Sequence, residues 1–172
     1  MTPLYQSAPM FKDLQTLYFG SDHAAWTLKK ELMDQIKVQF PHLISIDCGP
    51  LTDASCDYPE FAWNVAQKVA QNSQSLGVLL CGTGIGVSLV ANQHPHIRAA
   101  LAHNHSTAQM ARQHNDAQIV CMGARQLDAH HAWEILRLFI QTPFDGDQPE
   151  GQRHIRRLNQ MYQLQETLKQ GI

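Results

Sequence analysis

Charged residues are scarce in this sequence: Asp, Glu, Lys and Arg make up 16% of its 172 residues, against roughly 25% in typical soluble domains. So few charges indicate a chain that buries more surface than a monomer would, as in an oligomer. Neither sign dominates, because 13 basic and 15 acidic residues give a formal net charge of -2. No overall field therefore favours nucleic acid or an anionic membrane, and an anionic ligand needs a local cluster of basic groups.

Long apolar runs and paired cysteine motifs are also missing. No run approaches the ~18 to 20 apolar residues that span a bilayer, and the first residues, MTPLYQSAPMFKDLQ, lack the pattern of a secretory signal. We therefore expect a cytoplasmic protein with no membrane contact. None of the cysteines forms a CxxC pair, so the sequence predicts neither a disulfide framework nor a zinc ribbon. Cys48 and Cys121 fit buried structural cysteines.

Short apolar runs alternate with segments of helical periodicity after the first 16 residues. The expected strands are 17–22, 43–49, 76–82, 98–103 and 117–123, and the expected helices are 24–39, 59–72, 85–93, 106–113 and 128–141. This alternation predicts an α/β fold, a three-layer α/β/α sandwich in which helices cover both faces of an open, five-stranded parallel sheet. Residues 17–172 form one domain in this prediction, and residues 1–16 form a loosely ordered extension. A last amphipathic helix, 151–169, has no strand after it and is expected to reach a neighbouring subunit.

The sequence CGTGIG, residues 81–86, is the strongest local signal for a site. It follows an apolar strand and precedes a helix, and its glycines let backbone N–H groups converge on one point. Its GxGxG spacing differs from the GxGxxG of dinucleotide sites, and no GK[ST] motif for a nucleoside triphosphate is present. The turn therefore predicts a site for an anion or an oxyanion, with a tight turn that binds nothing as the alternative.

Polar side chains follow the first and third expected strands. In such sheets ligands bind beyond the carboxyl ends of the strands, where the strand order reverses. Cys81 precedes the N–H groups of the turn, which favours a thiolate that acts as base or nucleophile over a structural cysteine. Thr83 offers a hydroxyl beside it. Asp22 and His23 are candidates to bind sugar hydroxyls or a phosphate, and capping of the helix that follows is the alternative.

Two candidates lie near the opposite edge of the sheet, where helices lead into strands. His114 and Asn115 precede the fifth expected strand, and the alternative is a helix cap with Asn115 in a left-handed conformation. His114 would reach Cys81 only from a second subunit, which favours a site shared within a dimer. Arg153 and Arg157 are four residues apart, so they share one helix face, as suits a phosphate group. A solvated basic stripe is the alternative.

Six further histidines predict no metal site. They contain no HExxH motif and no pair flanked by carboxylates, so we expect neither a metal nor another cofactor. They are His94, His96, His103, His105, His130 and His131. Arg125, two residues after the fifth expected strand, is a further candidate for binding an anion at the carboxyl edge.

The motifs GSDHA, DYP, CGTGIGVSLVAN, ARQHNDA, GAR and GQRHIRR, in this order, resemble those of the ribose-5-phosphate isomerase type B and galactose-6-phosphate isomerase family. The resemblance runs from about Leu17 to Met161. It implies a Rossmann-like sandwich that works without metal as a dimer or a dimer of dimers. The expected reaction interconverts the sugar phosphates ribose 5-phosphate and ribulose 5-phosphate through an enediolate.

The same resemblance implies a role for each matching position. Cys81 would be the base that moves a proton between C1 and C2. His114 would open the furanose ring as proton donor, with help from Thr83 and Asp22. Backbone N–H groups would stabilise the enediolate, contributed by Gly82, Gly84, Ile85 and Gly86. The other positions would bind substrate: Asn115 at the intermediate, Tyr58 at the pocket border, and His23, Arg125, Arg153 and Arg157 at the phosphate, with His154 close by.

Cys81 and His114 both occur in this chain, whereas heteromeric galactose-6-phosphate isomerases divide such residues between different subunits. A homodimer or homotetramer is therefore expected. Three departures leave a hexose phosphate, allose 6-phosphate or galactose 6-phosphate, open as the substrate: the N-terminal extension, a longer loop before Arg153, and Ser106 where an aromatic residue is common. A non-catalytic sugar-phosphate-binding protein is a further alternative, against which the intact set of Cys81, Thr83 and His114 argues. No signature supports a cysteine hydrolase.

Overall fold

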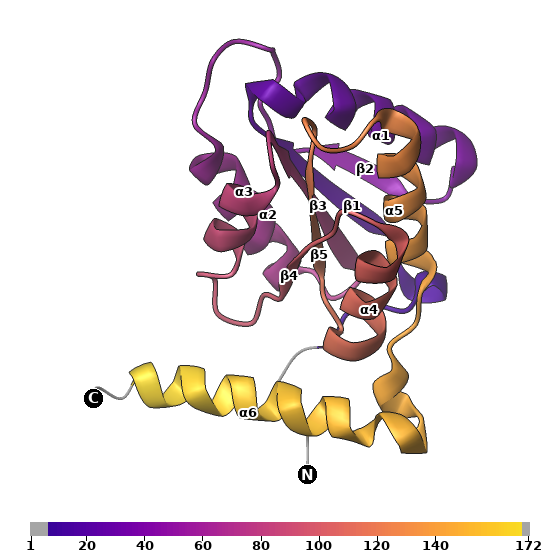
Figure 1. Cartoon of the computed structure of the whole chain (residues 1–172), viewed down its shortest axis with the longest axis vertical. Helices are drawn as coiled ribbons and strands as arrows, with labels where there is room; N and C mark the ends of the chain where they lie inside the picture. The colour runs from indigo at the N-terminus through magenta and orange to yellow at the C-terminus, as the bar shows by residue number, and fades with distance from the viewer. Residues whose placement is uncertain (1–6, 170–172) are drawn as a thin grey trace.

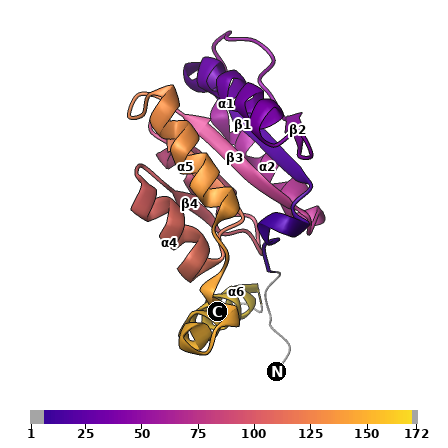
Figure 2. The same ribbon diagram turned by 90° about the vertical axis from the view of Figure 1, so that its right-hand side faces the viewer.

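A five-stranded parallel sheet lies at the centre of the molecule, which is a computed structural model that describes residues 7–169 (Figures 1 and 2). The strands are β1 (Thr16–Ser21), β2 (Ile44–Asp47), β3 (Ser75–Cys81), β4 (Ala99–Leu101) and β5 (Ile119–Gly123). Their order is β2-β1-β3-β5-β4, and all neighbours are parallel. Every residue of β3 and β5 is buried, as the continuous apolar runs predict.

Helices cover both faces of the sheet, which confirms the expected three layers. They are α1 (Trp26–Gln39), α2 (Tyr58–Gln71), α3 (Ile85–Ala91), α4 (His105–Asn115), α5 (Ala129–Gln141) and α6 (Gln152–Lys169). On one face α5 packs between α1 and α4, and on the other α2 packs against α3 (Figures 1 and 2). Each face has its own apolar core against the sheet.

The segment before β1 packs against the domain. Residues Phe11–Asp13 form one turn of 3-10 helix, the Phe11 ring lies 5.5 Å from the Phe40 ring, and Leu14 is buried. The expectation of a loosely ordered extension is therefore wrong for residues 7–16, because apolar side chains in this short segment pack against the core on the α1 and α5 face of the sheet. Residues 1–6 lie outside the described part of the chain.

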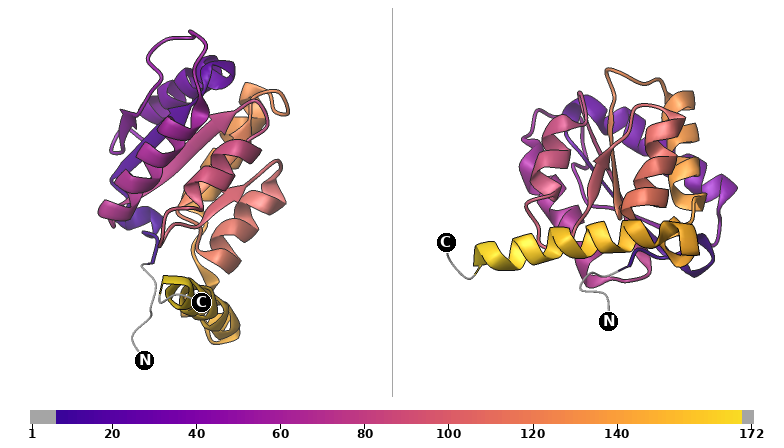
Figure 3. Two further views of the ribbon diagram at one scale, coloured as in Figure 1. Left: turned by 90° about the vertical axis from the view of Figure 1, so that its left-hand side faces the viewer. Right: turned by 60° about the horizontal axis from the view of Figure 1, so that its bottom comes forward.

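Helix α6 lies along the amino edge of the sheet, and its last turns project past the body of the domain (Figures 1 and 3). Leu158 and Tyr162 are buried on its inner side, whereas Leu164 and Leu168 are exposed. Exposed leucines on a projecting helix fit the expected contact with a neighbouring subunit, which stays a prediction. None of the helices in residues 7–169 combines the length and apolar character needed to cross a lipid bilayer.

Candidate active site

The strand order reverses between β1 and β3, which lie side by side at the centre of the sheet. β1 ends at Ser21, the register neighbour of Leu80, and β3 ends one residue later at Cys81. The residues that follow these two strands therefore meet at one point of the carboxyl edge, as expected for the floor of a pocket.

Cys81 lies under the glycine turn and contacts it directly. Its side chain is 5% exposed, and its Sγ accepts a hydrogen bond from the Gly84 N–H at 3.1 Å. A donor aimed at sulfur stabilises negative charge there. Gly84 has φ of 79°, and a Cβ on it would lie 2.6 Å from Leu101 Cδ1, so this position excludes a side chain. The exposed Thr83 accepts the Ile85 N–H on its Oγ1 at 3.3 Å.

Arg125 and Tyr58 flank the turn on two sides. A Cβ on Gly82 would lie 3.2 Å from Arg125 Cζ, and a Cβ on Gly86 would lie 2.6 Å from Tyr58 Cζ. The glycines thus permit a guanidinium and an aromatic ring to approach the backbone closely. A cavity of about 300 Å³ opens beside the turn, lined by Thr83, Ile85, Leu101, Ala102, His103, Gly123 and Gln126.

Asp22 and His23 complete the carboxyl edge at the end of β1. Asp22 is 9% exposed, its side chain makes no capping hydrogen bond, and its Oδ1 has no hydrogen-bond partner within residues 7–169. The capping alternative is therefore wrong for Asp22, and α1 begins at Trp26 rather than at residue 24. A nearly buried carboxylate oxygen without a partner is available to a ligand hydroxyl. His23 is exposed, and its Nδ1 lies 3.2 Å from the Cys56 carbonyl oxygen.

Two other cysteines differ from Cys81 in their surroundings. Cys121 is fully buried, and burial raises the pKa of its thiol strongly. Burial also raises the pKa of the half-buried Cys48. Both thiols therefore stay protonated at neutral pH, and the backbone donor on its sulfur distinguishes Cys81 as the candidate base.

His114 and Asn115 lie at the opposite end of the strands, in the last turn of α4. The left-handed residue that ends this helix is Asp116, with φ of 45°, so the alternative of a left-handed Asn115 is wrong. The His114 ring stacks on the ring of His154 from α6, with centroids 4.5 Å apart and planes 6° apart. His154 is buried, His114 is partly exposed and Asn115 is exposed.

One chain therefore holds the predicted residues in two groups. The carboxyl edge carries Asp22, His23, Tyr58, Cys81, Gly82, Thr83, Gly84, Ile85, Gly86 and Arg125. The amino edge carries His114, Asn115, Arg153, His154 and Arg157, of which both arginines are exposed. Ile119, the first residue of β5, is the register neighbour of Gly77 in β3, which lies four residues before Cys81. Four residues of a strand span roughly 13 Å. The geometry of a single chain keeps the groups apart, as expected.

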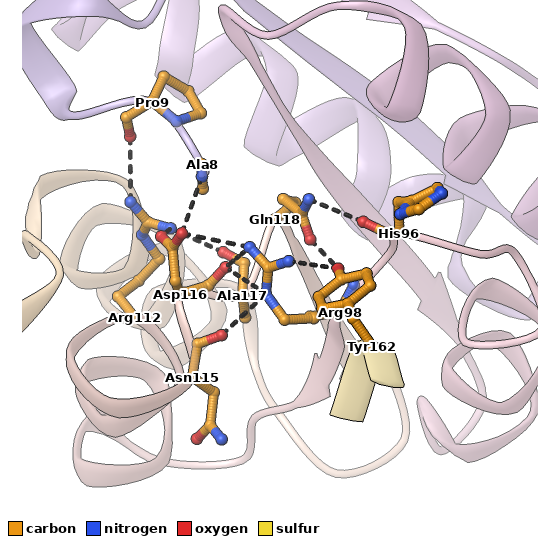
Figure 4. A network of polar contacts seen from close by, with 10 residues as sticks. All are labelled: Ala8, Pro9, His96, Arg98, Arg112, Asn115, Asp116, Ala117, Gln118 and Tyr162. Atoms are coloured by element: carbon orange, nitrogen blue, oxygen red, sulfur yellow. Dashed lines mark hydrogen bonds and ion pairs between the residues drawn. The ribbon is translucent and has the colours of Figure 1, made fainter. Parts of the chain in front are cut away.

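A buried ion network behind His114 escaped the sequence analysis (Figure 4). The Asp116 carboxylate pairs with Arg112 at 2.9 Å and with Arg98 at 3.2 Å, and Arg98 also donates to the Tyr162 hydroxyl at 2.6 Å. The sequence offers only a weak signal for this network, namely charged residues beside apolar strands in a chain that has few charges.

The profile of a family described as ribose/galactose isomerase matches residues 17–161. The chain belongs to this family. A ribose-5-phosphate isomerase B of Mycobacterium tuberculosis is 38% identical over 152 residues, which cover 88% of this chain and 90% of that protein. The solved ribose-5-phosphate isomerase B of Clostridium thermocellum has a TM-score of 0.83 at 34% identity and covers 90% of this chain and 99% of its own. The type B enzyme of Trypanosoma cruzi has a TM-score of 0.82 at 40% identity, with 90% and 98% covered.

Family membership confirms the expected enzyme class, a sugar-phosphate isomerase that interconverts aldoses and ketoses. The structural matches confirm the Rossmann-like fold. The roles of the individual site residues in this isomerase remain predictions.

One cluster of metal-ligating side chains lies at the start of α5. Asp128, His130 and His131 have ligand atoms within 4.8 Å of one another, but all three are exposed. Asp128 also caps α5, where its Oδ1 accepts the His131 N–H at 2.8 Å. A larger cavity of about 570 Å³, between α1 and α5, contains none of the predicted site residues.

The His154 imidazole makes the stability of this isomerase dependent on pH. Burial lowers the pKa of His154 below 6.5, and the charges of His114, Arg153 and Arg157 lower it further, against a small opposite effect of Asp145. The unfolded chain then takes up a proton at higher pH than the folded one. Stability present above about pH 6.5 is thus lost as the pH falls through the lower folded pKa.

We therefore expect the midpoint of thermal unfolding to fall between about pH 7.5 and about pH 5.5, and to fall less in His154→Gln. His105→Gln, at an exposed position of α4, is the matched control and should follow the wild type. Equal pH dependence in His154→Gln and the wild type would assign the effect to other groups.

Proposed function

We propose that this chain interconverts ribose 5-phosphate and ribulose 5-phosphate as a homodimer. Each of its two active sites would combine the carboxyl edge of one subunit with the amino edge of the other. The observation that carries the proposal is the Cys81 thiol, held by the Gly84 N–H at the centre of a glycine turn and bordered by Arg125 and Tyr58. The names of the matching proteins, ribose-5-phosphate isomerase B, support the choice of substrate.

The proposed reaction begins with ring opening of the bound furanose. The partner subunit's His114 donates a proton to the ring oxygen, and the Asp22 carboxylate takes the proton of the O1 hydroxyl as the C1–O bond breaks to form the aldehyde. Asp22 and Thr83 hold the sugar hydroxyls during this step. The Oδ1 of Asp22, which has no partner within residues 7–169, is the acceptor that such a hydroxyl needs.

Proton transfer between C2 and C1 follows. The Cys81 thiolate removes the C2 proton, and the electron pair of that bond forms the C1–C2 double bond of an enediolate. The N–H groups of the turn, from Gly82 to Gly86, stabilise the oxyanion. A proton then moves from O2 to O1, the Cys81 thiol returns its proton to C1, and the ketose results. The partner subunit's Asn115 would hold the intermediate in place.

The phosphate would be bound by His23 and Arg125 together with the partner subunit's Arg153 and Arg157. The two arginines of α6 are exposed and one helical turn apart. Replacing either by methionine should raise KM for ribose 5-phosphate by roughly 10- to 100-fold, because a hydrogen bond to a charged group contributes about 1.5 to 3 kcal/mol. The effect on kcat should be much smaller.

Arg156→Met is the matched control for the two arginines. Arg156 is equally exposed on α6 but lies about 100° round the helix from Arg157. Its KM should equal that of the wild type. If all three variants share one KM, the phosphate is bound elsewhere.

The direct test is an isomerase assay of the purified protein in deuterated water. Ribose 5-phosphate should give ribulose 5-phosphate, and allose 6-phosphate and galactose 6-phosphate are the parallel substrates. The loop before α6 is the reason for testing the hexose phosphates, since its two short turns, Asp145–Asp147 and Pro149–Gly151, pack against α6 beside the proposed phosphate site. Faster turnover of a hexose phosphate would establish the hexose alternative. Tight binding without exchange or turnover would establish a non-catalytic protein.

A further inference from the structure

The Asp116 carboxylate lies at the centre of the buried ion network, directly after the predicted site residues His114 and Asn115 of α4 (Figure 4). Asp116 is 0% exposed and ends the helix in a left-handed conformation. Its carboxylate is shared by Arg112 and Arg98 and also accepts the Ala8 N–H at 2.9 Å. The guanidinium of Arg98 further binds the carbonyl oxygens of Asn115 at 2.9 Å and of Asp116 at 2.7 Å. The backbone after His114 is thus fixed from both sides.

The same guanidinium also anchors α6. Arg98 donates to the hydroxyl of the buried Tyr162 at 2.6 Å, and His96 stacks on the Tyr162 ring with centroids 5.4 Å apart. Tyr162 lies two turns after His154 on this helix. Two contacts therefore join the end of α4 to α6: the Arg98 network and the stack of His114 on His154.

The segment before β1 closes this network from the far side. Besides the Ala8 N–H on Asp116, the Pro9 carbonyl oxygen accepts a hydrogen bond from Arg112 at 3.0 Å. The Pro9 carbonyl oxygen thus gives the buried Arg112 Nη2 an acceptor, and the Ala8 N–H adds a third donor group to the carboxylate beside the two guanidiniums.

We propose that Asp116 is a positioning residue for the amino-edge half of the active site, and that Ala8 and Pro9 complete the same device. The network fixes the position of the end of α4, which carries His114 and Asn115, relative to α6, which carries the two arginines of the proposed phosphate site. The kinetic consequences of this inference rest on the proposed function, whereas its effect on the stack of His114 on His154 does not.

The two arms of the network should affect different kinetic parameters. Asp116→Asn removes the charge that holds both guanidiniums, so His114 loses its fixed position and kcat should fall roughly 10- to 100-fold. Tyr162→Phe removes only the hydroxyl that ties α6 to Arg98, so phosphate binding should weaken and KM should rise while kcat changes by less than about two-fold. A role in stability alone would lower the fraction of folded enzyme and leave KM unchanged.

Deletion of the N-terminal segment tests the contribution of Ala8 and Pro9. A variant without residues 1–9 should lower kcat in the same direction as Asp116→Asn. A variant without residues 1–6 keeps both contacts and is the matched control, with the kcat of the wild type. Leu32→Ala, on α1 in the core against β1 and α5, controls for destabilisation: its melting temperature should fall while kcat and KM stay unchanged.

The stacked imidazoles give a readout that needs no substrate. NMR cross-relaxation between the ring protons of His114 and His154, whose centroids are 4.5 Å apart, should be present in the wild type and in Leu32→Ala and absent in Asp116→Asn. A wild type without isomerase activity would reject the proposed function and leave this measurement as the test. Retention of the stack in Asp116→Asn, or unchanged kcat and KM in the folded variants, would overturn the inference. Should Asp116→Asn fail to fold, Tyr162→Phe and the deletion pair decide.

Discussion

Replacement of Cys81 by alanine is expected to lower kcat for ribose 5-phosphate by roughly 10²- to 10⁴-fold, the range that a positioned general base contributes. KM should change little, because the proposed phosphate ligands are other residues. Cys81→Ser should be almost equally inactive, since a serine hydroxyl is far less ionised than a thiol under the same backbone donor. The measurements are the initial rate of ribulose 5-phosphate formation and the exchange of the C1 proton of ribulose 5-phosphate in deuterated water.

Cys48→Ala is the matched control for this substitution. Cys48 is also a free thiol, half-buried and directly after β2, and its sulfur lies 3.9 Å from the Ile46 carbonyl oxygen. Its kcat should equal that of the wild type. If Cys81→Ala keeps a tenth or more of the activity, the base is another group, and the nearly buried Asp22 carboxylate at the adjoining strand end is the next candidate.

The carboxyl-edge half of the site could be predicted because it is built from local sequence. The residues between Cys81 and Gly86 form one turn directly after a buried strand, so their mutual arrangement depends on a few backbone angles. The arrangement of β1 beside β3 follows from the general topology of parallel sheets. Sequence alone could therefore place Asp22 and His23 beside the turn.

The amino-edge half depends on contacts between segments far apart in the chain, which periodicity does not report. Ala8 and Asp116 are 108 positions apart, and Arg98 and Tyr162 are 64 apart. Such contacts also explain why the left-handed residue is Asp116 rather than Asn115. Both residue types tolerate this conformation, but only position 116 places a carboxylate between the two arginines. The packing of residues 7–16 was missed for the same reason.

Two inactive variants should restore activity when they share a dimer. In a heterodimer of Cys81→Ala with His114→Ala, one site loses both groups, while the other keeps Cys81 from one subunit and His114 from its partner. Free exchange of equal amounts makes about half of the dimers mixed, so about a quarter of the wild-type activity should return. Each variant alone should show almost none. Purification of the heterodimer through two different tags should raise the recovery to about half.

The matched control shows whether the exchange of subunits alone restores activity. Cys81→Ala and His114→Ala are combined in one chain, which is then paired with a wild-type subunit. If each site draws Cys81 and His114 from different subunits, this heterodimer has no intact site and should be inactive. If both groups act within one subunit, the wild-type half keeps about half of the activity, and the first heterodimer shows none. The two heterodimers thus give opposite results under the two arrangements. The separation of Cys81 from the His114 and His154 stack along the strands favours the arrangement in which the first heterodimer is active.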